Sequence, residues 1–422
     1  MNETLAASTS ASVKESPGFY QHIVLDALGR MTAGSLRIEL PGGAQRVIGT
    51  PGSDISAVIR VRDAAFFKRC VLFGDVGFGE SYVAGEWDTD SIERVIAWAI
   101  LNVENSPSMS GSKSRAFALN LLKFANRVQH LLRPNSVRTA RQNISEHYDL
   151  GNDFYRLWLD PTMTYSSAYF TAPDQSLESA QTAKYDALCH KLRLLPTDHV
   201  LEIGSGWGGF ASHAVRHYGC RVTTVTISTE QFNFARERFA GEGIADRVDI
   251  RLEDYRRLTG QFDKVASIEM MEALGDRYLE TYFTKIHELL KPDGLVGLQY
   301  ITAPDSRHAE LKRGVDWIQK HIFPGSLLLS IGRVNQALNR TGDFFLHHLE
   351  DLGLSYARTL RTWFDTFNAR IAEVRALGFD DRFIRKWNYY LQYCEAAFSM
   401  RNISVVQAIY TRPNNPRLRS LA

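Results

Sequence analysis

The stretch HVLEIGSGWGGF, residues His199–Phe210, carries the strongest fold signal in the chain. An apolar run ends at Glu202, and glycines at positions 204, 206, 208 and 209 then open a helical stretch. Glycines let a chain turn sharply from strand to helix and approach a ligand without a Cβ in the way. The stretch therefore predicts a strand, a ligand-binding loop and a helix.

Short apolar segments flank this loop and alternate with helical stretches. The alternation predicts an α/β domain with a mainly parallel sheet and helices on both faces. A mostly helical segment is expected from about residue 305 to 401, and Ser404–Tyr410 is expected to return as an edge strand. The strand candidates are Val200–Ile203, Arg221–Val225, Val248–Leu252, Lys264–Ile268 and Leu295–Tyr300, and the helix candidates are 209–218, 229–241 and 277–290.

Residues 19–104 have a different pattern, which predicts a smaller α+β domain. Ser35–Leu40 and Ala57–Val61 are strand candidates, and Phe66–Phe73 suits a short helix. A Gly-rich passage, Gly74–Gly85, follows, and Ser91–Asn102 predicts a helix capped by its serine. Since no catalytic constellation occurs here, we interpret the domain as a packing or lipid-contacting module.

The composition excludes several classes of protein. A net charge of +2 over 422 residues gives no global field for nucleic acid, and apolar runs such as Val95–Leu101 are far shorter than the roughly 20 residues that span a bilayer. The cysteines at 70, 189, 220 and 394 lack metal-ligand or disulfide spacing, so no metal is predicted. Residues 1–18 predict a disordered leader rather than a signal peptide, and with it a cytoplasmic location.

The segment between the two domains is basic. Residues 105–145 contain no Asp or Glu, and an apolar stripe from Phe117 to Leu131 recurs at helical spacing within the linker 105–140. Such a helix suits an anionic membrane surface, where each basic residue contributes about 1 kcal/mol of attraction. The alternative is that the stripe packs on protein and the charges are solvated. Residues 113–141 are the predicted peripheral membrane contact, with Lys113, Arg115, Lys123, Arg127, Arg133, Arg138 and Arg141.

Two nucleotide-like ligands fit the Gly-rich loop. Gly204-x-Gly206-x-x-Gly209 satisfies the dinucleotide pattern, but that match is weak by itself. Glu202 stands two residues before the first glycine, as in the E-x-G-x-G loop of methyltransferases that use S-adenosylmethionine (SAM). The next strand ends in Thr226-Ile227-Ser228, with no acid at its tip to bind a ribose 2′-hydroxyl group. SAM is therefore the predicted cofactor.

Several ordered segments together resemble the cyclopropane-fatty-acyl-phospholipid synthase family, which includes the mycolic acid cyclopropane synthases. The resemblance covers nearly the whole chain, and Gly74–Trp87 is similar to the end of the family's N-terminal lipid-binding domain. It implies a class I SAM-dependent methyltransferase domain of Rossmann-like fold over residues 141–422, preceded by a lipid-binding domain over 19–104. The other matching segments are His147–Asp153, Met163–Ser166, Leu201–Phe210, Val225–Gln231, Glu253–Arg256, SIEMMEALG at 267–275 and Ile318–Gly325.

The resemblance implies transfer of a one-carbon unit from SAM to the double bond of an unsaturated phospholipid acyl chain. It assigns Tyr165 and Ser166 to the methionine end of SAM, and Asp254 and Tyr255 to the region beside the adenine. The remaining cofactor positions that it implies are Glu202, Gly204, Ser205, Gly206, Gly208 and Gly209 in the loop, and Thr226, Ile227 and Gln231 for ribose and adenosine.

The family's synthases also hold a bicarbonate ion, which is taken to be the catalytic base. The resemblance carries its Glu, Ile and Tyr ligands over to Glu272, Ile301 and Tyr356. Ser167 stands where the family's Cys is usual, and Gln299 stands where its His is usual. Both side chains can still hydrogen-bond an anion, so bicarbonate stays a candidate ligand with two of its ligands replaced.

The implied reaction needs a base and a dry aromatic wall. Alkene attack on the sulfonium methyl leaves a carbocation, which aromatic ring faces stabilise. Proton loss from the added methyl closes a cyclopropane, whereas proton loss from the chain gives a methyl-branched or methylene product. Glu272 is expected to orient the anion or take the proton itself, and Glu269 is expected to be a structural acid. The aromatic candidates, most of them expected to be core, are Tyr165, Tyr169, Phe170, Tyr300, Trp317, Phe323 and Trp363.

Several alternatives stay open at this point. The replaced Cys and His motivate the hypothesis that the product is other than a cyclopropane. A small-molecule methyltransferase and a non-catalytic lipid carrier are the rival classes, although neither accounts for all segments. Cys394 matches a family cysteine and is interpreted as an inert core residue. The family's tendency towards dimers makes a homodimer an expectation.

Overall fold

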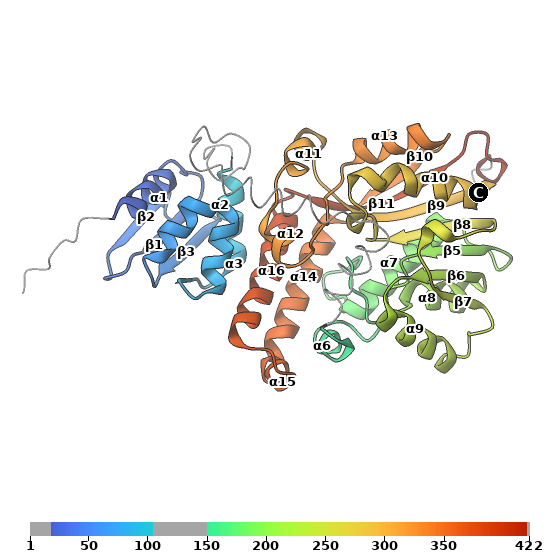
Figure 1. The fold of residues 1–422 in the computed structure, drawn as a ribbon, viewed down its shortest axis with the longest axis horizontal. Coiled ribbons are helices and arrows are strands. Elements are labelled where there is room, and N and C mark those ends of the chain that lie inside the picture. The colour runs from blue at the N-terminus through green and yellow to red at the C-terminus, as the bar shows by residue number, and fades with distance from the viewer. Residues whose placement is uncertain (1–17, 104–149, 420–422) are drawn as a thin grey trace, which may run out of the picture.

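The computed structural model describes residues 18–103 and 150–419, which form an N-terminal unit and a larger unit (Figure 1). The predicted leader, apart from Gly18, and the predicted basic linker with its amphipathic helix lie outside the described residues.

The N-terminal unit is built on one sheet with the strand order β2-β1-β3-β4. β1 pairs with β2 in antiparallel and with β3 in parallel orientation. Alternate residues of β3 are buried, as a strand with one face on a core requires. The elements are α1 (Phe19–Gly29), β1 (Ser35–Glu39), β2 (Gln45–Gly49), β3 (Ser56–Val61), α2 (Ala65–Val83), β4 (Trp87–Asp88) and α3 (Ile92–Leu101), which Ser91 caps as predicted.

The helix predicted over Phe66–Phe73 is longer than expected. α2 continues to Val83 across a kink at Gly74, where φ is 60° and ψ is −134°. Gly77 and Gly79 of this passage allow close packing, which the turn-like composition does not reveal. A Cβ on Gly79 would lie 2.4 Å from Cδ1 of Trp317, a residue of the larger unit.

The larger unit contains, within the described residues, a seven-stranded sheet with the order β10-β11-β9-β8-β5-β6-β7. The strands from β9 to β7 are mutually parallel, and β11 and β10 are antiparallel additions. The strands are β5 (His199–Ile203), β6 (Arg221–Thr226), β7 (Val248–Leu252), β8 (Phe262–Ile268), β9 (Leu290–Thr302), β10 (Phe345–Asp351) and β11 (Ser404–Thr411).

The prediction that Ser404–Tyr410 is an edge strand is wrong. β10 pairs with its outer side, so β11 is an interior strand. β10 was missed because its sequence, FLHHLED, is polar and none of its residues is fully buried.

Helices cover both faces of this sheet (Figure 1). Leu201 packs in one apolar core with α10 and α13, whereas its neighbour Val200 packs in another with α7, α8 and α9. A strand with cores on both faces accounts for the continuous apolar runs in the sequence. The helices are α6 (Asn152–Arg156), α7 (Leu177–Lys191), α8 (Gly209–Tyr218), α9 (Thr229–Gly241), α10 (Leu279–Leu289), α11 (Asp305–Leu311), α12 (Trp317–His321), α13 (Ile331–Thr341), α14 (Gly353–Ala369), α15 (Ile371–Ala376) and α16 (Asp381–Ser399).

Helices α14 and α16 lie between the large sheet and the N-terminal unit (Figure 1). The two units meet through polar as well as apolar contacts. Arg385 of α16 donates from Nε to the carbonyl oxygen of Tyr82 at 2.7 Å. Glu80 of α2 accepts hydrogen bonds from Lys320 Nζ at 2.7 Å and from His321 Nε2 at 3.0 Å, both on α12. These contacts hold the N-terminal unit against helices α12 and α16 of the larger unit.

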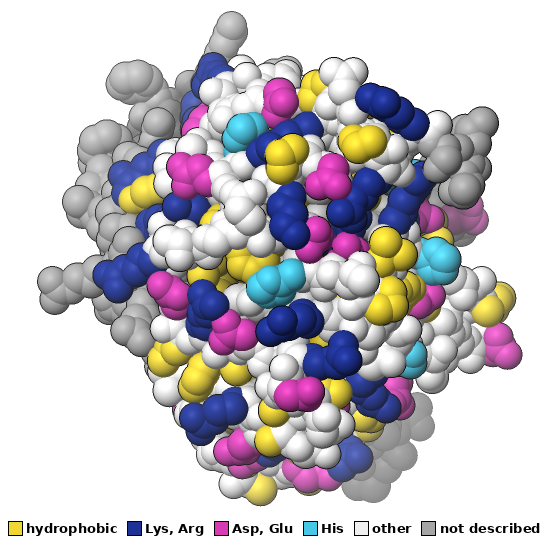
Figure 2. Space-filling model, turned by 90° about the vertical axis from the view of Figure 1, so that its right-hand side faces the viewer, with side chains coloured by type: hydrophobic (Ala, Val, Ile, Leu, Met, Phe, Trp, Pro, Cys, Tyr) yellow, Lys and Arg dark blue, Asp and Glu magenta, His cyan; other side chains and the backbone are white. Residues whose placement is uncertain are grey.

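The surface of the larger unit that faces away from the N-terminal unit is mixed in charge. Figure 2 shows Lys and Arg side chains interspersed with Asp and Glu across this face. Among the described residues, no helix combines the length and the apolar composition that a bilayer crossing requires.

We predict that Gly79→Ala weakens the contact between the two units. Its new Cβ would overlap the buried ring of Trp317, and overpacking of this kind costs about 1–3 kcal/mol. Urea unfolding followed by fluorescence measures this loss.

Gly29→Ala, at the end of α1, is the matched control. Its Cβ would meet no described atom within 4 Å, so only the usual gain in helix propensity is expected. Equal stability of the two variants would contradict the packing argument.

Candidate active site

The loop after β5 has the backbone that its glycines predict. Gly206 has φ of 50° and Gly208 has φ of 86°, both in the left-handed region that favours glycine. A Cβ on Gly208 would lie 2.7 Å from the ring of Phe239, so this glycine lets α8 pack against α9. A Cβ on Gly206 would meet no described atom within 4 Å, because this position borders a cavity.

A cavity of about 1040 Å³ extends from this loop to the N-terminal unit. Its polar end lies at the carboxyl ends of the parallel strands, where open α/β sheets bind their ligands. Its apolar end is bounded by N-terminal side chains that include Phe73, Phe78, Ile96 and Ile100. The volume is at the upper end of the range of about 300–1,000 Å³ for small-molecule sites, which leaves room for two ligands.

The structure brings nearly all predicted cofactor positions to this cavity. Gly208 is the exception, since it packs against Phe239 and does not line the cavity. The lining positions are Tyr165, Ser166, Glu202, Gly204, Ser205, Gly206, Gly209, Thr226, Ile227, Gln231, Asp254 and Tyr255.

Local hydrogen bonds orient the side chains beyond β6. Thr226 Oγ1 donates to Gln231 Oε1 at 2.9 Å, and Ser228 caps α9. Asp254 accepts from Arg256 at both oxygens, at 2.8 and 2.6 Å. Burial by itself raises the pKa of Asp254, but the hydrogen bonds from Arg256 hold that pKa below its usual value. This carboxylate is therefore ionised and fixed before any ligand arrives.

A buried lysine that the sequence did not reveal lies beside Ser166. Lys184 of α7 is fully buried, and its Nζ donates to Ser166 Oγ at 2.7 Å. Burial lowers the pKa of Lys184 to about 7, against the attraction of Glu269, Asp160 and Glu202. A lysine within a polar helical stretch normally lies in solvent, so no local pattern marks this position as buried.

Glu202 is buried at the end of β5. It accepts a hydrogen bond from Thr224 Oγ1 at 2.6 Å. Burial raises the pKa of Glu202 to about 8, although Thr224 and the charge of Lys184 oppose the shift. A carboxyl group at this position can therefore exchange its proton near neutral pH.

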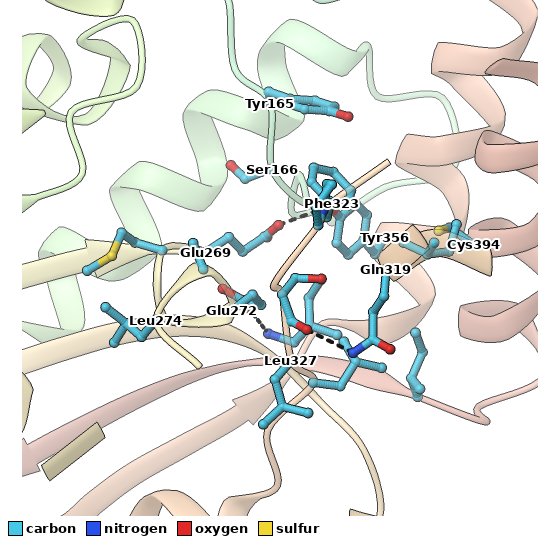
Figure 3. A pocket seen from close by; sticks show the side chains of 18 of the residues that line it. Tyr165, Ser166, Glu269, Glu272, Leu274, Gln319, Phe323, Leu327, Tyr356 and Cys394 are labelled. Carbon is cyan, nitrogen blue, oxygen red and sulfur yellow. Dashed lines mark hydrogen bonds between the residues drawn. The ribbon is translucent and has the colours of Figure 1, made fainter. Parts of the chain in front are cut away.

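Glu269 accepts hydrogen bonds from three of the predicted anion ligands, and Figure 3 shows it together with one of them, Tyr356. Its Oε1 accepts from the backbone N–H of Ser167 at 2.8 Å and from Nε2 of Gln299 at 2.8 Å. Its Oε2 accepts from the hydroxyl group of Tyr356 at 2.9 Å. These bonds place Glu269, which the sequence analysis expects to be a structural acid, at the centre of the predicted anion-binding group.

Glu272 lies nearby with fewer partners. Its Oε1 accepts from the backbone N–H of Ile301 at 2.5 Å, whereas its buried Oε2 finds no partner among the described residues. Burial, and then the neighbouring charge of Glu269, raise the pKa of Glu272 to about 8. Glu272 is thus mainly a neutral acid at pH 7.

The donors expected to bind bicarbonate are already used within the described residues. Gln299 Nε2 also donates to the carbonyl oxygen of Ser167 at 3.3 Å, and the Ser167 hydroxyl group donates to the carbonyl oxygen of Ala168 at 2.9 Å. Ser167 and Gln299 are buried and do not line the cavity. An added anion would meet the Glu269 carboxylate, to which Ser167, Gln299 and Tyr356 already donate, so the residues present do not fit bicarbonate.

Aromatic side chains surround the polar centre. Of the seven aromatic candidates, Tyr165 and Phe323 line the cavity and the other five do not. Tyr390, which the sequence analysis did not single out, also lines the cavity, and its hydroxyl group lies 2.8 Å from that of Tyr165. Cys394 borders the cavity, where burial raises the pKa of its thiol, so it stays protonated and is a poor nucleophile.

Comparison with known proteins adds independent information. The family model described as mycolic acid cyclopropane synthetase matches residues 135–408. Tuberculostearic acid methyltransferase UfaA1 of Mycobacterium tuberculosis is 35% identical over 404 residues, which cover 93% of this chain and 92% of that protein. The cyclopropane-fatty-acyl-phospholipid synthase of Escherichia coli is 37% identical over 357 residues, which cover 84% of this chain and 88% of that protein.

Solved structures agree with these relatives. The mycolic acid cyclopropane synthase CmaA1 complexed with SAH and CTAB superimposes with a TM-score of 0.60 at 30% identity, covering 64% of this chain and 98% of that chain. Coclaurine N-methyltransferase, at 18% identity and a TM-score of 0.62, shares the fold alone. The class I methyltransferase fold expected from the sequence is confirmed.

Proposed function

This chain belongs to the mycolic acid cyclopropane synthetase family, and on that premise we propose that it transfers a one-carbon unit from SAM to the double bond of an unsaturated fatty acyl chain of a phospholipid. The protein is a SAM-dependent methyltransferase, and the product proposed here is a cyclopropane fatty acid. The observation that carries the proposal is the single cavity that joins the Gly-rich loop to an apolar region bounded by the N-terminal unit.

The polar end of the cavity is the proposed SAM site. SAM supplies a methyl group activated by a sulfonium charge. Tyr165 and Ser166 would contact its methionine end, and Lys184 holds the Ser166 hydroxyl group in place. Thr226, Ile227 and Gln231 would contact the ribose and adenosine, and Asp254 and Tyr255 would flank the adenine. The loop from Glu202 to Gly209 would approach the same ligand, with Gly206 as its most open backbone position.

The apolar end of the cavity is the proposed acyl-chain site. Phe73, Phe78, Ile96 and Ile100 supply apolar side chains to a wall in which Asp75 is the one charged N-terminal residue that lines the cavity within the described part of the chain, and burying an acyl chain there removes apolar surface from water. Tyr165 and Phe323 stand where this region meets the polar end, so their ring faces can stabilise a carbocation. The proposed reacting centre is the group formed by Ser167, Glu269, Glu272, Gln299, Ile301 and Tyr356.

The relatives' names favour two kinds of product. One relative is named a cyclopropane synthase and another a methyltransferase for tuberculostearic acid. The replacements at Ser167 and Gln299 keep a methyl-branched or methylene product as the second candidate, because they change the donors around the proposed base.

We predict SAM-dependent turnover only with unsaturated lipid. Purified protein given methyl-labelled SAM should label dioleoyl phospholipid vesicles and leave distearoyl vesicles at background, because a saturated acyl chain has no π electron pair to attack the sulfonium methyl. Mass spectrometry of the labelled chains separates a cyclopropane from a methylene or methyl-branched product. Equal labelling of both vesicles, or labelling of a soluble amine alone, would contradict the proposal.

We predict that Gly206→Ala weakens binding of S-adenosylhomocysteine at least tenfold in calorimetry. Its Cβ would project into the proposed cofactor space. Gly243→Ala is the control, because Gly243 also has positive φ and open surroundings but lies outside the cavity lining. Both variants carry a left-handed backbone cost of about 1–2 kcal/mol, so a similar loss of affinity in both would reject the assignment.

A peripheral membrane contact through residues 113–141 is also proposed, and these residues lie outside the described part of the chain. We predict that changing Lys123, Arg127 and Arg133 to Gln reduces binding to anionic vesicles at least tenfold at low salt, because each basic residue adds about 1 kcal/mol of attraction. Cosedimentation measures this binding, and the exposed residues Lys68, Arg382 and Arg419 changed to Gln are the control. Equal binding by both triple variants would contradict the proposal. The homodimer stays a prediction.

A further inference from the structure

Glu269 has a backbone conformation that is unusual for its residue type. Its φ is 48°, in the left-handed region that glycine adopts without steric cost and that strains a residue with a Cβ. Such strain persists where the surroundings hold a residue in place, and it is concentrated at functional sites. The strained backbone at this position therefore indicates a role for the Glu269 side chain itself.

Donors from three separate segments converge on the Glu269 carboxylate. The backbone of Ser167 lies before α7, Gln299 is on β9 and Tyr356 is on α14. Each donates to Glu269 at 2.8–2.9 Å. A carboxylate that accepts three hydrogen bonds and donates none is matched in its ionised form.

The surroundings of the two neighbouring carboxyl groups, Glu269 and Glu272, also favour Glu269 as the ionised one. Burial raises the pKa of Glu269, and the hydrogen bonds from Gln299 and Ser167 and the charge of Lys184 offset only part of that rise. Glu272 has a single donor for Oε1 and an unpartnered Oε2 within the described residues. When two carboxyl groups are neighbours, ionising both is unfavourable, and the one with more hydrogen-bond donors is the one that ionises. The three donors therefore favour Glu269 over Glu272 as the ionised member of the pair.

We propose that the Glu269 carboxylate occupies the place of the bicarbonate ion and is itself the base of the reaction. Its three donors sit at positions where the resemblance predicted bicarbonate ligands, and its side chain fills the space between them. Glu269 also lines the cavity beside Ser166 and Phe323, so it faces the region assigned to the reacting carbons (Figure 3). Bicarbonate is then neither bound nor required.

The proposed step, which rests on the proposed function, balances without a further reactant. The alkene electron pair forms a C–C bond to the methyl carbon as the C–S bond breaks, leaving S-adenosylhomocysteine and a carbocation on the acyl chain. A C–H bond then gives its electron pair to the cationic carbon, and its proton moves to Glu269. Glu269 returns the proton to water when the products leave, so one proton is released in each turnover.

The test compares the wild type with Glu269→Gly and Glu269→Gln in buffer freed of carbon dioxide, with and without added bicarbonate. Wild-type turnover of SAM on dioleoyl vesicles should be unchanged by bicarbonate. Both variants should lose at least 100-fold in turnover. Bicarbonate or formate should restore Glu269→Gly at least tenfold, because the deleted side chain leaves a space lined by the same donors. Neither anion should restore Glu269→Gln, whose amide fills that space.

Glu272→Gln separates the two carboxyl groups. Replacing a neutral acid by a neutral amide should reduce turnover less than Glu269→Gln does. A larger loss at Glu272, wild-type dependence on bicarbonate, or full activity of Glu269→Gln would each overturn the proposal. Glycine relieves the strained φ at position 269, and binding of S-adenosylhomocysteine verifies the fold of each variant. If Glu269→Gly does not fold, the wild-type bicarbonate response and the two Gln variants still decide. Absence of wild-type labelling of dioleoyl vesicles would instead reject the proposed function.

Discussion

A carboxylate can be kept ionised out of water only if donors replace the water molecules, and the arrangement around Glu269 meets this requirement. The N–H of Ser167, the amide of Gln299 and the hydroxyl group of Tyr356 reach its two oxygens from three parts of the chain. Through Tyr356, α14 contacts the residue that directly follows β8. This constraint also accounts for the positive φ at Glu269, because the backbone must bend to deliver the side chain to its donors.

The same constraint connects the two ends of the cavity. Lys184 is buried close enough to Glu269 to favour its charge, and its ammonium group holds the hydroxyl group of Ser166 on the proposed cofactor side. Glu272 remains neutral because burial, and then the neighbouring charge of Glu269, raise its pKa to about 8. The centre thus combines an anion for proton removal with apolar and aromatic surroundings, where a carbocation meets little water.

Much of the fold could be read from local patterns. The apolar run before Glu202 and the helical periodicity after it gave β5 and α8, and Ser91 gave the start of α3, since these signals depend only on neighbours in sequence. β10 gave no such signal, because an edge strand with polar side chains lacks apolar alternation. Gly79 of α2 looked like a loop residue because the reason for it, the close approach of Trp317, comes from a residue more than 200 positions away.

The sequence by itself determined the α/β architecture, the Gly-rich loop and the family, because short contiguous motifs carry that information. It also identified Ser167, Gln299 and Tyr356 as members of one group. Only the tertiary structure decided what they surround. Their donors converge on Glu269 rather than on Glu272. β8 and β9 are neighbouring strands, and Tyr356 of α14 reaches the residue that follows β8, although residues 167 and 356 are far apart along the chain. The charge of a buried acid is set by such distant donors, so no local pattern could distinguish the two glutamates.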